Sequence, residues 1–207
     1  PEQVKRISPF IILLMSLCFK TTASFALVIK VFPGAHSIQN AINKAHNGDT
    51  LLVQKGLYKE HNIIVQKRLV IIGNGYPVID AESRYQVFTI SYDSVIIKGL
   101  QIQNVGTASV TDMAGIRIAN SKNVIVENNR LINNTFGVYL QNSAYCRVIN
   151  NIIHCNIKDQ LNGGNGVHAW KSNHLLIEGN SVSGHRDGLY FEFVTESGIM
   201  GNTSSGN

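Results

Sequence analysis

Gly115-Ile-Arg-Ile, Gly137-Val-Tyr-Leu, Gly166-Val-His-Ala and Gly188-Leu-Tyr-Phe are four copies of one pattern, a glycine that leads a short strand-like segment. The sequence intervals between successive glycines are 22, 29 and 22. A column of asparagines has the same three intervals, and it contains Asn129, Asn151, Asn180 and Asn202. The interval from each glycine to its asparagine is constant. The extra residues of the longer repeat therefore always lie between an asparagine and the next glycine.

A fixed internal period of this length is typical of a solenoid, in which each repeat leaves apolar surface bare until the next one covers it. Apolar residues alternate or form short β-branched runs bounded by Gly, Asn and Ser, which is strand patterning. We therefore predict an all-β, right-handed parallel β-helix with rungs of about 22 residues. Leu100 takes the asparagine position one long interval before Asn129, so the extended loops are expected near residues 103–114 and 154–165.

The residues that point into the helix follow from the same register. Two inward stacks are expected, Ile116, Val138, Val167 and Leu189, and Ile118, Leu140, Ala169 and Phe191. Cys146 falls in register with Val124 and Leu175, which predicts a small buried hydrophobe. The asparagine column is expected to stack its amides between rungs at the ~4.8 Å strand spacing and to be structural.

The open N-terminal end of the solenoid needs a cap, because its first strands have unpaired edges. Residues 37–45 are expected to form a short capping helix across the first coil, with Ile38, Ala41, Ile42 and Ala45 on one face. Ser37 is the expected N-cap, and Gly48-Asp49 is expected to end the helix before the next strand.

Residues 1–26 read as a cleavable signal peptide. Lys5 and Arg6 form a basic region, residues 7–19 form an apolar core, and Ser24-Phe25-Ala26 matches a small-x-small cleavage site. The apolar run is shorter than the roughly 20 residues that span a bilayer. We therefore expect secretion, with a permanent membrane anchor as the weaker alternative.

Residues 27–207 are expected to form one parallel β-helix domain. Removal of residues 1–26 takes away three positive charges and one negative charge, so the formal charge falls from +5 to +3. The remaining Lys and Arg are scattered, and we expect no nucleic-acid binding. The sequence begins with Pro1 and stops inside a repeat at Asn207, which predicts a C-terminally incomplete piece of a longer helix.

The residue two positions after each repeat glycine is expected to point outward. One outward column contains Arg117, Tyr139, His168 and Tyr190, and the column beside it contains Ala119, Gln141, Trp170 and Glu192. Together they predict an exposed aromatic and polar strip that could bind a ligand or partner. The alternative is that aromatic residues simply favour strand surfaces.

Two groups of residues beside this strip have chemistry of their own. His154 and Cys155 are the type of ligand that Cu(I) or Zn prefers, and Met113, His168 and His185 could add to them from neighbouring rungs. The alternative is an ordinary loop pair, because no CxxC or HxxxH spacing is present. The second group is the turn that contains His185, Arg186 and Asp187, and it could contact a ligand or partner. The alternative is that Asp187 only orders its turn and that Arg186 only pairs with Asp187.

The chain resembles the NosD family in residues 164–172, Gly-Asn-Gly-Val-His-Ala-Trp-Lys-Ser, and above all in residues 184–194, Gly-His-Arg-Asp-Gly-Leu-Tyr-Phe-Glu-Phe-Val. Residues 49–60 also fit, although many pectin-lyase-like β-helices share that opening. The resemblance implies a non-catalytic periplasmic protein that helps to assemble the copper–sulfide centre of nitrous-oxide reductase. Its implied partners are an ABC transporter permease and ATPase, the reductase and other copper chaperones, and copper is the implied metal.

Two other functions remain open from the sequence. A polysaccharide-binding or polysaccharide-cleaving β-helix, namely a lyase, epimerase or glycoside hydrolase, would need positioned acid and base groups. Glu192 has no outward carboxylate at the equivalent place in neighbouring rungs, and Asp112, Asp159 and Asp187 are dispersed among loops, which disfavours catalysis. A structural or adhesive solenoid would need no cluster of His, Arg, Trp and Glu.

Overall fold

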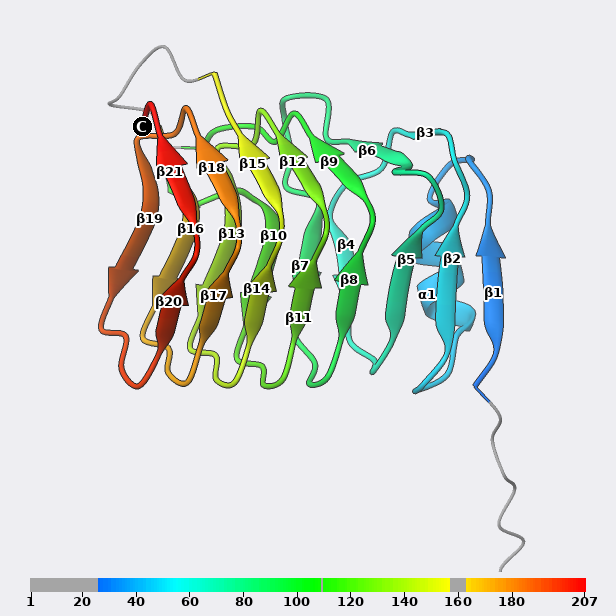
Figure 1. The fold of residues 1–207 in the computed structure, drawn as a ribbon. Coiled ribbons are helices and arrows are strands. Elements are labelled where there is room, and N and C mark those ends of the chain that lie inside the picture. The colour runs from blue at the N-terminus through cyan, green and yellow to red at the C-terminus, as the bar shows by residue number, and fades with distance from the viewer. Residues whose placement is uncertain (1–25, 109, 157–162) are drawn as a thin grey trace, which may run out of the picture.

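The protein is a right-handed parallel β-helix of three sheets, which confirms the expected fold class (Figure 1). This computed structural model describes residues 26–108, 110–156 and 163–207. The expected signal peptide lies outside the described residues except for Ala26. Within the described ranges, no helix is long and apolar enough to cross a membrane.

Three sheets run the length of the molecule, and every strand pair in them is parallel. Sheet A has eight strands: β1 (Val28–Val31), β2 (Thr50–Val53), β5 (Val70–Gly73), β8 (Ile96–Lys98), β11 (Ile125–Glu127), β14 (Arg147–Ile149), β17 (Leu176–Glu178) and β20 (Gly198–Met200). Sheet B has seven: β3 (Leu57–Tyr58), β6 (Val78–Asp80), β9 (Gln101–Gln103), β12 (Arg130–Ile132), β15 (Ile152–His154), β18 (Ser181–Ser183) and β21 (Thr203–Ser205). Sheet C has six: β4 (Ile63–Val65), β7 (Phe88–Ile90), β10 (Ala114–Ala119), β13 (Phe136–Gln141), β16 (Asn165–Trp170) and β19 (Asp187–Glu192).

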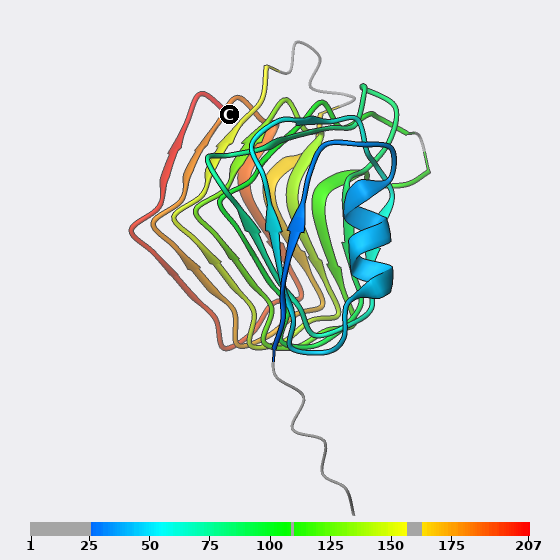
Figure 2. The same cartoon turned by 90° about the vertical axis from the view of Figure 1, so that its right-hand side faces the viewer.

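From β2 to β19 each coil contributes one strand to each sheet, and the later strands pair in the register that the repeat predicts. Val138 lies between Ile116 and Val167 in sheet C, and Tyr139 lies between Arg117 and His168. The coils have similar outlines when viewed along the stack (Figure 2). The two long connections join β9 to β10 and β15 to β16, so both occur at the corner between sheets B and C, as expected.

The inward stacks form one continuous apolar core along the axis. The expected core residues of β10, β13 and β16 are fully buried, while Leu189 and Phe191 of β19 are partly buried and pack against the same core. Cys146 is also fully buried, as expected. The carbonyl oxygens of Ser121 and Ala144 lie 3.7 and 3.4 Å from its sulfur.

The asparagine column forms a ladder of amides between neighbouring coils. Asn151 Oδ1 accepts hydrogen bonds from the backbone N–H and the Nδ2 of Asn129, at 2.9 and 3.1 Å. Asn151 in turn donates from its backbone N–H and its Nδ2 to Asn180 Oδ1, both at 2.9 Å. Leu100 donates its backbone N–H to Asn129 Oδ1 at 3.1 Å, which confirms its place in the column.

A second column at the corner between sheets B and C was not recognised in the sequence. Asn134 Oδ1 accepts the backbone N–H of Val105 at 3.2 Å, and Asn207 Oδ1 accepts the backbone N–H of His185 at 3.1 Å. This column has the same long and short intervals as the first one, but Val105 and His185 occupy two of its positions, so a search for repeated asparagines did not find it.

The helix α1 (Ser37–Lys44) takes the place of a sheet C strand in the first coil, beside the end of that sheet (Figure 2). Its buried face is Ile38, Ala41 and Ile42, as expected. The side chain of Gln39 pairs with the free edge of β4, where its Oε1 accepts the backbone N–H of Ile64 at 2.7 Å. An exposed strand edge is thereby covered.

The expected cap at Ser37 is wrong. Ser37 lies inside the helix and its hydroxyl makes no hydrogen bond among the described residues, while His36 is the N-cap residue without a side-chain cap. The buried carboxylate of Glu60 caps the helix instead, accepting the backbone N–H groups of Ile38 and Gln39 at 3.0 and 2.8 Å. An acidic group at this end also interacts favourably with the helix dipole.

Candidate functional site

The first outward column lies on sheet C as the register predicts. Arg117, Tyr139, His168 and Tyr190 follow one another on β10, β13, β16 and β19. Their side chains stack: the Arg117 guanidinium lies 4.7 Å from the Tyr139 ring centroid, and the Tyr139 and His168 rings are 4.5 Å apart. His168 and Tyr190 meet edge to face at 5.0 Å.

The expectation of an exposed strip is correct only at its C-terminal end. Tyr190 is 37% exposed, but Tyr139 and His168 are only 6% and 9% exposed. Phe136 covers them, because its ring lies 5.9 Å from that of Tyr139 and 5.6 Å from that of His168. Trp170 packs against this cluster and remains partly exposed.

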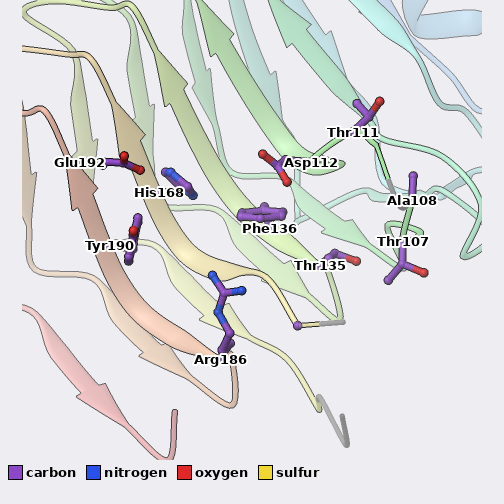
Figure 3. A pocket seen from close by; sticks show the side chains of 11 residues that line it. Thr107, Ala108, Thr111, Asp112, Thr135, Phe136, His168, Arg186, Tyr190 and Glu192 are labelled. Carbon is purple, nitrogen blue, oxygen red and sulfur yellow. The ribbon is translucent and has the colours of Figure 1, made fainter. Parts of the chain in front are cut away.

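A cavity of about 520 Å³ opens over the C-terminal part of the strip (Figure 3). Thr107, Thr111 and Asp112 of the first long connection form one side of it. The other side contains His168, Arg186, Tyr190 and Glu192, with Phe136 between the two sides. Its size lies within the range of ligand pockets, roughly 300–1,000 Å³.

A chain of hydrogen bonds runs from the turn before β19 to His168. Arg186 Nε donates to Asp187 Oδ2 at 3.0 Å, and Arg186 Nη2 donates to Asn165 Oδ1 at 3.1 Å. Asn165, which is fully buried, then donates from Nδ2 to His168 Nδ1 at 3.1 Å. Asp187 and Arg186 therefore do more than order their own turn, since their pair holds the amide that orients His168.

Burial and neighbouring charges shift the pKa of two groups around this cavity. Burial lowers the pKa of His168, and this shift is opposed by the nearby carboxylates of Asp112 and Glu192. Burial also raises the pKa of Tyr139, and Asp112 adds to that shift. The structure thus brings Asp112 and Glu192 to one cavity, although Asp112 looked isolated in the sequence.

Three of the expected soft metal ligands, His154, Cys155 and His185, line one cavity, but among the described residues they are not placed to hold a metal ion together. His154 uses both ring nitrogens, Nδ1 with Ser183 Oγ at 2.9 Å and Nε2 with Asn156 Oδ1 at 3.1 Å. Cys155 is a buried free thiol whose pKa is raised by burial. It shares a second cavity of about 450 Å³ with His154 and His185.

The other two metal candidates lie apart from these three. Met113 packs against the main core, and His168 faces the first cavity. Within the described ranges, no group of three or more His, Cys, Asp or Glu side chains is placed to hold a metal ion. The described donors therefore do not fit a resident copper ion.

His185 predicts a pH dependence of stability. It is 3% exposed, and burial lowers its pKa from 6.5 to about 4, although its hydrogen bond to the Ser183 carbonyl acts in the opposite direction. The unfolded chain therefore takes up a proton near pH 6.5, while the folded chain resists protonation until about pH 4. The stabilisation is complete above pH 6.5 and is lost as the pH falls towards 4, with a slope of up to about 1.4 kcal/mol per pH unit.

Urea unfolding of wild type and His185→Asn across this pH range measures the effect. Asparagine suits this position, because His185 stands in the second amide column. We expect wild type to lose stability relative to His185→Asn as the pH falls from 6.5 to 4, because only wild type has the buried imidazole. A difference that stays constant across this interval would contradict the prediction.

The comparisons with known proteins agree with this fold. The family model described as periplasmic copper-binding protein (NosD) matches residues 42–207. Comparison with curated proteins gave no match. Among solved structures, pectate lyase Pel9A is similar with a TM-score of 0.58 and 16% identity over 80% of this chain and 55% of that chain. The catalytic domain of a GH87 alpha-1,3-glucanase in complex with nigerose is similar with a TM-score of 0.65 and 20% identity over 84% of this chain and 33% of that chain.

The two structural similarities establish only the shared β-helix fold, because both identities are low. The chain spans about half of the lyase and a third of the glucanase domain. The family model, in contrast, extends from the middle of α1 through all the later coils. The chain therefore belongs to the NosD family of periplasmic copper-binding proteins.

Proposed function

We propose that this chain is a periplasmic accessory protein for assembly of the copper–sulfide centre of nitrous-oxide reductase. The observation that carries the proposal is the family match over residues 42–207. The proposed partners are an ABC transporter permease and ATPase, the reductase and other copper chaperones. The signal peptide expected in residues 1–26 would deliver the chain to the compartment where they meet.

The proposed role is that of a docking platform, with copper as cargo of the assembly. A rigid solenoid presents extended surfaces to partners, because each coil is held by its two neighbours. Tyr190, Arg186 and Trp170 are at least partly exposed at the C-terminal end of sheet C, and they combine aromatic rings with an arginine, residue types that are enriched in protein interfaces. No resident copper ion is needed for this role.

Deletion of the gene in its native host tests the proposal. We expect the reductase to be made and exported but to lack the visible absorption of its copper–sulfide centre, because the assembly step has lost its platform. A plasmid copy of the full-length chain should restore the absorption. A periplasmic copper enzyme without a sulfide centre serves as the control and should keep its copper. A reductase with a complete centre in the deletion strain would refute the proposal.

A further inference from the structure

The buried imidazole of His168 has one nitrogen without a partner among the described residues. His168 is 9% exposed and lines the first cavity, and its Nε2 is buried with no hydrogen bond. A buried polar atom that is not hydrogen-bonded costs free energy, about 1–3 kcal/mol. Such an atom calls for an explanation, and beside a cavity its partner is a water molecule or a bound ligand.

The hydrogen-bond chain from Asp187 decides which nitrogen of His168 carries the proton. Arg186 can only donate, so the Asn165 oxygen faces Arg186 and the Asn165 nitrogen faces His168. His168 Nδ1 must then accept, which places the proton of the neutral ring on Nε2. The lowered pKa of His168 supports the neutral form.

This tautomer makes His168 a donor to the cavity and not a metal ligand. A histidine binds a metal through a nitrogen lone pair, and here the Nδ1 lone pair is used by Asn165 while Nε2 carries hydrogen. The reverse tautomer would require the Asn165 amide to turn over. Its NH₂ group would then face the guanidinium of Arg186, and two donors would oppose each other.

The charges around the cavity disfavour an anionic ligand. Asp112 and Glu192 both line it, and neither side chain has a hydrogen bond or ion pair with another described residue. Arg186 lines it too, but its charge is matched by Asp187 at 3.0 Å. Arg117 lies beside Asp112, whose backbone oxygen accepts from its Nη2, but Arg117 does not line the cavity. A bound anion would therefore face two carboxylates, whereas a hydroxyl group can donate to them.

We infer that this cavity binds an uncharged, hydroxyl-rich ligand, the chemistry of a neutral saccharide. Hydroxyl groups accept from His168 Nε2–H and donate to the carboxylates of Asp112 and Glu192. The rings of Phe136 and Tyr190 supply apolar surface for the C–H groups of the ligand. This inference is independent of the proposed assembly role, since it concerns the occupant of one cavity.

The first part of the test is the tautomer of the wild-type protein. NMR of ¹⁵N-histidine-labelled mature chain reports which nitrogen carries the proton. We expect His168 to be protonated at Nε2. In the Asn165→Asp variant a carboxylate replaces the donor and can still pair with Arg186, so the proton should move to Nδ1. A wild-type His168 protonated at Nδ1 would overturn the inference.

The second part is binding, measured by isothermal titration calorimetry. The probes are maltotetraose, cellotetraose and laminaritetraose, with tetragalacturonate as the charged counterpart. We expect at least one neutral sugar to bind more tightly than the uronate, and Asn165→Asp to weaken that binding on the order of tenfold. His174→Ala, which removes a histidine outside the cavity, should bind as wild type does.

Either of two results would overturn the inference. One is that no neutral sugar binds the wild-type protein, or that the uronate binds as tightly. The other is that Asn165→Asp binds the sugar as wild type does while its NMR spectrum shows a folded chain with the proton at Nδ1. Neither result bears on the deletion experiment, so the two proposals can fail separately.

Discussion

Replacing Asn151 by alanine should destabilise the protein by about 4 kcal/mol, the largest single effect that we expect. Asn151 is buried, and its Oδ1 satisfies two donors of Asn129 while its Nδ2 reaches the carbonyls of Val126 and Ile149 at 2.9 and 3.1 Å. Alanine removes these bonds and leaves donors and acceptors buried on both neighbouring coils. The change in urea midpoint at constant m-value measures the loss.

The control for this change is Asn202→Ala in the same column. Asn202 also accepts from Asn180 and donates to the Ile177 carbonyl at 2.7 Å, but it is only partly buried, so water can replace part of what is lost. We expect less than half the effect of Asn151→Ala. Equal losses of unfolding free energy for the two variants would show that burial does not determine how much each asparagine of the column stabilises the protein.

Replacing Gly137 by alanine should cost about 3 kcal/mol, because the added methyl group has no space. Its Cβ would lie 2.4 Å from the backbone oxygen of Gly166 and 2.6 Å from Ile153 Cγ2. The backbone oxygen cannot move without disturbing the next coil. Thermal unfolding followed by far-ultraviolet circular dichroism should show a clearly lower midpoint.

Gly115→Ala is the matched control in the same column. There the nearest atoms to the added Cβ are Asn134 Nδ2 and the Gly137 oxygen, both at 3.0 Å, so smaller shifts suffice. We expect about 1 kcal/mol of destabilisation. A larger loss for Gly115→Ala than for Gly137→Ala would contradict the packing argument.

The later coils were predictable from sequence because each contact between them joins residues that are either 22 or 29 positions apart. Counting the short and long intervals therefore placed Tyr139 beside His168 and Asn151 beside Asn180, as the structure confirms. The corner loops were located by the same count, because an insertion changes the separation only on its own side.

The site was less predictable, since the residues that shape it do not recur from coil to coil. Phe136 is the first residue of β13, and strand alternation would group it with the inward Val138, so the sequence gave no reason to place it over His168. Asp112 belongs to an insertion that has no equivalent in the next coil. The cap of α1 was missed for a related reason: the local rule favoured Ser37, whereas Glu60 reaches the helix from the following coil.

The two long connections leave from β9 and from β15, with the short corner after β12 between them. They are therefore separated by two strand spacings, or about 10 Å. The gap between such insertions can change only in steps of one strand, because the hydrogen-bonded stack allows no intermediate position. In a parallel β-helix the distance between the strands from which two such insertions leave is thus a whole number of coils. Specificity for ligand size can then change by moving an insertion to another coil, without altering a single residue of the core.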